Sequence, residues 1–313
     1  MKNNLSNIKK AKNILDHQDC VAVPTETVYG LAANAYSDKA VKKIFKLKKR
    51  PQNNPLIVHY HNIDDLKRDC EINSDFLKLY KKFSPGPITY VLNLKKTSKI
   101  SKFATNNKST LAVRFPKHNL MKKLLKLLKY PLAAPSANLS TKVSSVCFQD
   151  VKDDFGNKLK FILDGGRASV GVESTIISLV NKPQILRLGG LEVSSIENCL
   201  NKKLRLKLNS KKISSPGQMK LHYSPGIPIR LNIKKPNKNE AYLLLKKRNN
   251  LKDNYYYLSN KGNLKEAIKN LYGTLRKIKK DNFKSLAVER IKNQGLGETI
   301  NDRLLRASKF NAK

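Results

Sequence analysis

The 313-residue sequence lacks features that would place it in several familiar classes of protein. It has no tryptophan, few acidic residues and four cysteines, which are Cys20, Cys70, Cys147 and Cys199. The cysteines are isolated from one another and form no Cys-x-x-Cys pair, so neither a zinc site nor a disulfide framework is expected. Cysteines used in this way are typical of a reducing compartment, and we expect a cytoplasmic protein.

Long apolar runs and common nucleotide-binding signatures are also missing. No run of about 18 apolar residues occurs, so we expect no transmembrane helix and no membrane partner. The basic N-terminal segment has no apolar core or small-residue cleavage site, which argues against a secretory signal. The sequence contains no P-loop, no G-x-G-x-x-G fingerprint and no nucleophile elbow, and its five histidines are scattered, so no protein-bound metal is expected.

Positive charge is abundant. Lysine and arginine number 63 against 23 acidic residues, which gives a formal net charge of +40. Lysine and asparagine occur throughout the chain without forming one basic stripe, so we favour a compositional bias on solvated faces over a dedicated nucleic-acid surface. Weak, salt-sensitive RNA or tRNA binding is still expected, because attraction to phosphates needs no specific site.

The apolar pattern predicts two α/β units joined by a linker. In residues 1–204 we expect a twisted, mixed sheet with strands near 20–23, 56–60, 88–94, 111–115, 161–163, 175–180 and 184–188. Helices are expected at 8–15, from Asp38 as N-cap to near 51, at 76–83 and at 119–129. Residues 205–228 are rich in Ser, Pro and Gly and predict a linker, and residues 229–313 predict a small second domain with strands near 241–245 and 285–288 and helices at 263–280 and 299–310.

Two early segments have the composition of a ligand site. Residues 24–31, PTETVYGL, form a rigid polar turn after a strand, although a simple capped turn would look the same. Lys48 and Arg50 lead into two prolines, and a stiff basic loop suits a polyphosphate, although basic residues also favour a helix C-terminus. His59 ends an apolar strand and is either a core histidine or a ligand residue.

Later segments add polar groups. Arg114 lies in an apolar strand, so it must pair with an internal carboxylate or meet an anionic ligand such as a substrate carboxylate. Residues 134–140, APSANLS, combine small residues with hydrogen-bonding side chains, and a plain serine-rich turn is the alternative. Residues 215–226 contain a His-Tyr pair between prolines and fit either a lid over a pocket or a stiff spacer.

Taken in order, these segments resemble the YrdC-like family, and specifically its two-domain threonylcarbamoyl-AMP synthases. The resemblance is carried by PTETVYGLAANA (24–35), KKRPQNNPLIVH (48–59), SPGPIT (84–89), LAVRFP (111–116), APSANLS (134–140), VGVESTI (170–176), ILRLGG (185–190), SPGQMKLHYSP (215–225) and GLGETINDRLLRAS (295–308). It implies a mixed-sheet YrdC-like domain with a concave basic face and a small Rossmann-like C-terminal domain. It also implies a reaction in which ATP, L-threonine and bicarbonate or CO2 give threonylcarbamoyl-AMP and pyrophosphate.

The same resemblance implies partners and site residues. The product would pass to transferase proteins that modify adenosine 37 of ANN-decoding tRNAs to t6A, and Mg²⁺ would accompany ATP. The threonine pocket would comprise Thr27, His59, Arg114, Ala134 and Ser174. ATP would be bound by Lys48, Arg50, Asn54, Thr110, Ser136, Ser144, Arg187 and Tyr223, with Lys48 and Arg50 as the catalytic electrostatic residues.

Two rival functions compete with this interpretation. A basic RNA-binding or ribosome-associated module would explain the charge without any turnover of ATP. A hydrogenase-maturation carbamoyltransferase would share the fold, but it would normally carry zinc-finger and acylphosphatase-like segments, which are not visible in this sequence.

Overall fold

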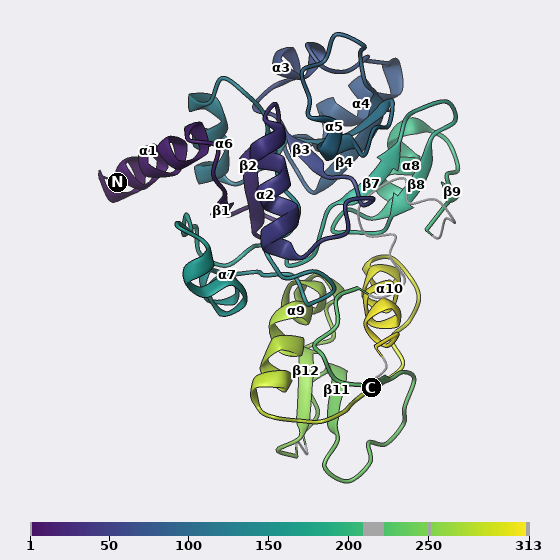
Figure 1. Cartoon of the computed structure of the whole chain (residues 1–313). Helices are drawn as coiled ribbons and strands as arrows, with labels where there is room; N and C mark the ends of the chain where they lie inside the picture. The colour runs from purple at the N-terminus through teal and green to yellow at the C-terminus, as the bar shows by residue number, and fades with distance from the viewer. Residues whose placement is uncertain (1, 209–221, 250–251, 311–313) are drawn as a thin grey trace.

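The computed structural model describes residues 2–208, 222–249 and 252–310 and contains two sheets (Figure 1). Within these residues the large sheet has nine strands, in the spatial order β1 (Val21–Val23), β2 (Gly30–Asn34), β6 (Leu132–Ala133), β3 (Ile57–His59), β5 (Thr110–Arg114), β4 (Ile88–Asn93), β7 (Thr175–Ser178), β8 (Gln184–Arg187) and β9 (Arg205–Leu206). Its pairings are both parallel and antiparallel, which confirms the predicted mixed sheet.

The second sheet is smaller and parallel. Over the described part of the chain it has four strands, in the order β10 (Ile229–Arg230), β13 (Leu286–Val288), β11 (Ala241–Lys246) and β12 (Tyr255–Ser259). Helix α9 (Leu264–Lys280) connects β12 to β13, as the α/β rhythm of this region predicts for parallel strands. The predicted small C-terminal α/β domain is therefore confirmed in its fold class.

Helices cover both sheets. The N-terminal set comprises α1 (Lys2–Asp16), α2 (Asp38–Lys48), α3 (Ile63–Lys67), α4 (Ser74–Phe83), α5 (Lys102–Thr105), α6 (Asn119–Leu127), α7 (Phe148–Phe155), a 3-10 turn at Gly156–Lys158, and α8 (Val193–Leu200). The C-terminal set comprises α9 (Leu264–Lys280) and α10 (Leu296–Ala307). None of the helices in the described ranges has the length and apolar character needed to cross a membrane.

Two details of the predicted elements are wrong, and a third is refined. Residues 161–163 form no strand, because Ile162 makes a single isolated bridge to Ala22. The N-cap of α2 is Ser37, whose hydroxyl accepts the Ala40 N–H, and Asp38 is instead the first residue of the helix, where a carboxylate favours the helix dipole. The predicted linker contains an edge strand, since Arg205–Leu206 pairs with β8, and its residues 209–221 lie outside the described part.

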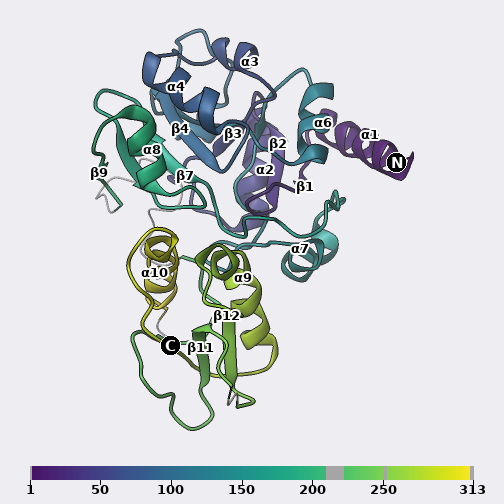
Figure 2. The ribbon, with the colours of Figure 1, turned by 180° about the vertical axis from the view of Figure 1, so that it is seen from behind.

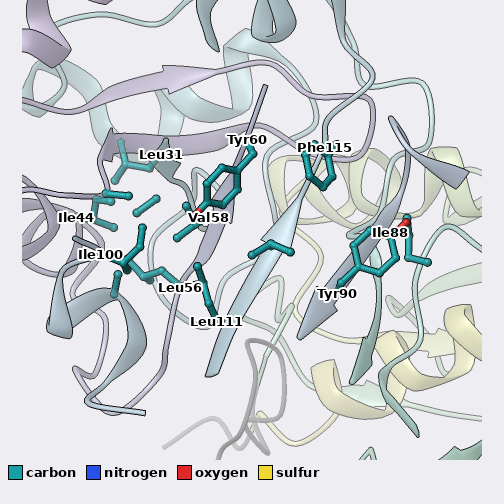
Figure 3. Close-up of a cluster of buried hydrophobic side chains, with 14 of the residues drawn as sticks. Leu31, Ile44, Leu56, Val58, Tyr60, Ile88, Tyr90, Ile100, Leu111 and Phe115 are labelled. Atoms are coloured by element: carbon teal, nitrogen blue, oxygen red, sulfur yellow. The ribbon is translucent and has the colours of Figure 1, made fainter. Parts of the chain in front are cut away.

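The alternation of side chains along the central strands separates a packed face from a polar one. Leu56, Val58 and Tyr60 point to one face, where they meet Leu111, Phe115, Ile88 and Tyr90 in the main apolar cluster (Figure 3). The intervening residues point the opposite way, because successive side chains of a strand alternate between faces. The second face therefore receives Ile57 and Ala112 and then, at the ends of β3 and β5, His59 and Arg114.

The two domains share a hydrophobic interior. Val28, Val143, Val146, Ala168 and Val172 of the first domain belong to the same buried cluster as α9 and the strands of the small sheet. Figures 1 and 2 show α9 and α10 at the junction between the two sheets. The backbones approach closely there: a Cβ on Gly171, whose φ is +81°, would lie 2.4 Å from the Lys269 carbonyl oxygen of α9.

We expect Leu111→Ala to lower the free energy of unfolding by about 2–5 kcal/mol, because Leu111 is buried in the main cluster and its loss leaves a cavity. Leu77→Ala is the matched control, since Leu77 is 47% exposed on α4 and its change should stay within about 0.5 kcal/mol. Urea unfolding of the full chain measures both values. Equal losses in the two variants would contradict this account of the core.

Candidate active site

A pocket of about 510 Å³, counting its open mouth, lies on the polar face of the large sheet. Its centre is set by the parallel pairing of β3 with β5, which places His59 directly beside Arg114 at the carboxyl ends of both strands. Ligands of α/β sheets commonly bind at this edge. The His59 side chain lines the pocket and does not pack in the main core.

The turn between β1 and β2 forms one wall. The Thr25 hydroxyl accepts the N–H groups of Thr27 and Val28 and donates to the Val28 carbonyl, so one side chain closes the turn. Thr27 is completely buried behind this wall, with its hydroxyl 2.9 Å from that of Thr25. The segment is therefore a turn closed by its own side chain, between two strands and not between a strand and a helix, and it also supplies lining residues, including Thr25 and Tyr29.

Arg114 has both an internal partner and an open donor. Its Nη2 donates to Glu26 Oε1 at 2.7 Å, while the other Glu26 oxygen accepts the backbone N–H of Lys117. Its buried Nε has no hydrogen-bond partner among the described residues. A guanidinium held on one side by a carboxylate and left open on another is suited to binding a second carboxylate.

The basic loop after α2 contributes one of its two predicted cations to the pocket surface. Arg50 lines the pocket and donates to the carbonyl groups of Asn54 and Pro55, which orient it. Lys48 lies behind the pocket, where its Nζ donates to the carbonyls of Ser136 and Asn138. Burial and the neighbouring Arg50 hold the Lys48 pKa well below its ordinary value.

The opposite wall comes from β8 and from the segment just before β7. Arg187 lines the pocket and donates through Nε to the Ser174 carbonyl and through Nη2 to the Ser174 hydroxyl, both at 3.1 Å. Ser174 is buried behind it and also contacts the Thr89 hydroxyl at 2.7 Å. Glu173 lines the pocket, and one of its oxygens accepts the Ser144 hydroxyl at 2.5 Å.

The end of the linker forms a third side. His222 and Tyr223 both line the pocket, and their ring centroids are 3.9 Å apart. The segment is fixed by Ser224, whose N–H donates to the Thr141 carbonyl at 2.9 Å and whose carbonyl accepts the Val143 N–H. The described end of the predicted lid therefore reaches the pocket, while residues 215–221 of that motif lie outside the description.

The structure brings seven of the predicted site residues to the pocket surface: His59, Arg114, Ala134, Arg50, Ser136, Arg187 and Tyr223. Six others are not in its lining: Thr27, Ser174, Lys48, Asn54, Ser144 and Thr110. The first five of these are buried, whereas Thr110 is half-buried at the start of β5, the end away from Arg114.

Sequence reasoning missed eight lining residues: Thr25, Val28, Tyr29, Gly30, Ile57, Pro135, Glu173 and His222. Most of them lie inside motifs that were singled out, so the motifs pointed to the correct segments but not to the side that faces the pocket. Glu173 could have been identified from the sequence, because it is an acidic residue that follows the apolar segment 170–172 and precedes a serine.

Buried polar atoms without partners mark the pocket as a ligand site. Among the described residues, the Nδ1 atoms of His59 and His222, Nε of Arg114 and the hydroxyl of Tyr223 are buried and have no hydrogen-bond partner. Buried polar groups are normally satisfied, since leaving one unpaired costs about 1–3 kcal/mol. Four such atoms around one cavity are available to hydrogen-bond a polar ligand.

The charge of the pocket favours an anion. Three guanidinium groups line it, and burial together with Arg187 lowers the pKa of Arg50 to about 9, which still leaves Arg50 cationic at neutral pH. Burial alone would raise the pKa of Glu173, but Arg303 and Arg187, with hydrogen bonds from Ser144 and Tyr272, lower it to about 2. No group of three or more His, Cys, Asp or Glu side chains in the described ranges is placed to hold a metal ion.

Burial sets the protonation of both pocket histidines. It lowers the pKa of His59 to about 3, assisted by Arg114, and the pKa of His222 to about 3, with Glu173 opposing the shift. Each histidine is therefore neutral in the folded chain above about pH 3, whereas the unfolded chain binds a proton below about pH 6.5. Stability is lost as the pH falls through this window, because the unfolded state then binds more protons.

We expect His59→Gln to reduce the pH dependence of the unfolding free energy, because it removes one of the two histidines that are neutral in the folded chain. Between pH 7 and pH 5 the loss of unfolding free energy should be about 2 kcal/mol smaller than in the unsubstituted chain. Denaturant unfolding at both pH values measures the difference. His17→Gln serves as the control, because His17 is exposed and lies just after α1. A slope equal to that of the unsubstituted chain would show that His59 is not neutral in the fold.

Comparison with known proteins gives matches along both domains. A family model described as telomere recombination matches residues 13–189, and one described as threonylcarbamoyl-AMP synthase, C-terminal domain, matches residues 191–309. The chain is 34% identical to the threonylcarbamoyl-AMP synthase of Pyrococcus abyssi, over 97% of this chain and 94% of that protein. It is 37% identical to the Schizosaccharomyces pombe enzyme of the same name, over 84% of this chain and 70% of the other.

Solved structures agree with these matches. The crystal structure of P. abyssi Sua5 complexed with L-threonine superposes with a TM-score of 0.88 at 33% identity, covering 96% of this chain and 94% of that one. A structure of the same P. abyssi protein, in which a histidine and the tyrosine that follows it are replaced by alanine, gives a TM-score of 0.87. The likeness thus spans both domains, and the chain belongs to the threonylcarbamoyl-AMP synthase family.

Proposed function

We propose that this chain makes threonylcarbamoyl-AMP and pyrophosphate from ATP, L-threonine and bicarbonate or CO2, for the t6A modification of tRNA. The observation that carries the proposal is the set of unpartnered polar atoms around a pocket that three arginines make cationic. ATP, bicarbonate and the carboxylate of threonine carry negative charge, and threonine adds an ammonium group and a hydroxyl that need hydrogen-bond partners. Membership of the family supplies the reaction, and the pocket supplies groups of matching chemistry.

Threonine would bind where β3 and β5 end. The open Nε side of Arg114 receives the substrate carboxylate, with the neutral His59 ring beside it and the Ala134 backbone opposite. Thr27 and Ser174 would contribute indirectly, without contacting threonine, because Thr27 shapes the turn and Ser174 orients Arg187. A solved relative is complexed with L-threonine, which supports placing the amino acid in this pocket.

ATP would occupy the remaining part of the pocket. Arg50 and Arg187 provide the positive charge for phosphates, while Ser136 and Tyr223 provide hydrogen-bonding groups. Lys48, Asn54 and Ser144 support these residues from behind, and a direct phosphate contact by Lys48 remains a prediction, as does any contact by Thr110. Mg²⁺ would arrive with ATP and neutralise part of the polyphosphate charge, since phosphates and water supply most of its ligands.

The chemistry needs positioning and charge stabilisation. The threonine amine loses a proton and its nitrogen bonds to the carbon of CO2, which gives a carbamate. A carbamate oxygen then bonds to the α-phosphorus of ATP, and the bond to the β-phosphate bridging oxygen breaks to release pyrophosphate. Arg50 and Arg187 stabilise the charge on the departing phosphates, and a closed pocket protects the carbamate and the adenylate from water.

Several sequence expectations continue as proposals. We place the catalytic domain at residues 1–204, the linker at 205–228 and the small domain at 229–313. Transferase proteins that act on tRNA would take up the product, and RNA binding by the +40 chain would be weak and salt-sensitive.

The direct test is pyrophosphate release from ATP and Mg²⁺, with and without L-threonine and with and without bicarbonate. We expect release that requires both. Release that ignores threonine would reject the proposed function, and tight RNA binding without turnover would favour the rival RNA-binding module.

Arg114→Ala should raise the KM for threonine by about tenfold or more while changing the KM for ATP little, because a lost carboxylate contact of this kind costs about 1.5–3 kcal/mol. Steady-state pyrophosphate release with each substrate varied in turn measures both constants. Arg68→Ala is the control, since Arg68 is an exposed arginine that pairs with Asp65 outside the pocket. Equal effects on both substrates would remove the carboxylate role from Arg114.

A further inference from the structure

The largest fully buried side chain near the pocket comes from the C-terminal domain. Arg303 lies on α10, and its guanidinium is enclosed at the junction of the two domains. Its Nε lies 3.1 Å from Glu173 Oε2 and 3.1 Å from the Tyr272 hydroxyl, and its Nη2 donates to the Leu188 carbonyl at 2.5 Å. A buried guanidinium is costly unless partners satisfy it, and these partners belong to both domains.

Glu173 connects this arginine to the pocket. One of its oxygens accepts the Ser144 hydroxyl, and the other accepts the Tyr272 hydroxyl at 2.7 Å and the Arg303 guanidinium. The carboxylate therefore has donors from the loop after β6, from α9 and from α10. Because Glu173 lines the pocket and Ser174 beside it orients Arg187, the position of this wall depends on contacts made by the C-terminal domain.

Tyr223 is held by the same arginine. The guanidinium carbon of Arg303 lies 4.6 Å from the centroid of the Tyr223 ring, within the range of a cation–π contact, and the Tyr272 ring stacks at 5.7 Å. The Tyr223 hydroxyl, which has no hydrogen-bond partner in the described part of the chain, belongs to the pocket lining. Arg303 thus contacts two lining residues on the side away from the cavity.

We propose that Arg303 is a positioning residue of the nucleotide half of the pocket, fixing Glu173 and Tyr223 from the C-terminal domain. The proposal rests on the proposed function for the identity of the nucleotide. It gives the small domain a part in substrate binding, because removal of its guanidinium would release both lining residues at once. Arg303 itself makes no substrate contact.

A residue that only holds the two domains together would give a different pattern of binding constants. Its loss would lower the stability of the chain and would weaken the binding of both substrates to a similar degree. A positioning residue changes ATP affinity selectively, because the proposed function places Tyr223, Arg187 and Ser144 on the ATP side and Arg114 with His59 on the threonine side. This pattern is the reverse of the one expected for Arg114→Ala.

The test uses the full chain with Arg303→Lys, which keeps one positive charge but cannot reach Glu173, the Leu188 carbonyl and the Tyr223 ring together. Calorimetric titration with MgATP alone and pyrophosphate release with each substrate varied are measured beside thermal unfolding. We expect the Kd and KM for ATP to rise about tenfold and the KM for threonine to change less than about threefold. Arg230→Ala is the matched control, because Arg230 pairs with Glu240 at 2.6 Å in the same domain and lies outside the pocket.

Unchanged ATP constants in a folded Arg303→Lys chain would overturn the proposal, and so would equal losses for both substrates. Tyr272→Phe provides a second variant if Arg303→Lys does not fold, since it removes one hydroxyl donor from Glu173 and keeps the ring. It should raise the Kd for MgATP by about threefold, and no change would count against the proposal. Failure of the proposed function has its own readout, which is an unsubstituted chain that binds MgATP but shows no threonine-dependent release.

Discussion

Three guanidinium groups are buried around one cavity, and each must be compensated inside the protein, because an unpaired buried cation costs several kcal/mol. The compensation differs in each case: a carboxylate for Arg114, backbone carbonyls for Arg50 and a serine for Arg187. In every case the partner lies behind the arginine relative to the cavity. The partners thereby orient the positive charges towards the space that a ligand would fill, and the surrounding turns and strand ends are arranged to supply them.

The same constraint explains why the pocket lies at the edge of the sheet. On β3 and β5 the packed face carries only apolar side chains, and the opposite face changes from Ile57 and Ala112 to His59 and Arg114 within one alternation. Strand ends are where backbone carbonyls and turns become available as partners for charge. A single register shift would exchange the two faces and bury Arg114 in the apolar cluster.

Much of this could be predicted from the sequence. An arginine in the apolar strand 111–115 demanded a partner or a ligand, and the Pro- and Gly-rich motifs marked the segments that surround the cavity. Short polar residues were harder, since Ser144, Ser174 and Thr27 look equally suited to a ligand or to a neighbouring protein group, and the structure uses all three within the protein. Lys48 is 90 residues from Asn138, and Glu173 is 130 residues from Arg303, and no local pattern encodes a pairing over such distances.

The shared interior beneath the pocket has a consequence for how the chain can be divided. Val28 belongs to the turn that lines the cavity, and it is also part of the cluster formed with α9 and the small sheet. A fragment that ended before residue 229 would carry the segments that line the pocket but would expose Val28, Val143, Val146, Ala168 and Val172 to water. Such a fragment would present an apolar surface next to the pocket and would tend to self-associate there. The domain boundary that is visible in the sequence is therefore not a position at which the folded protein can be divided.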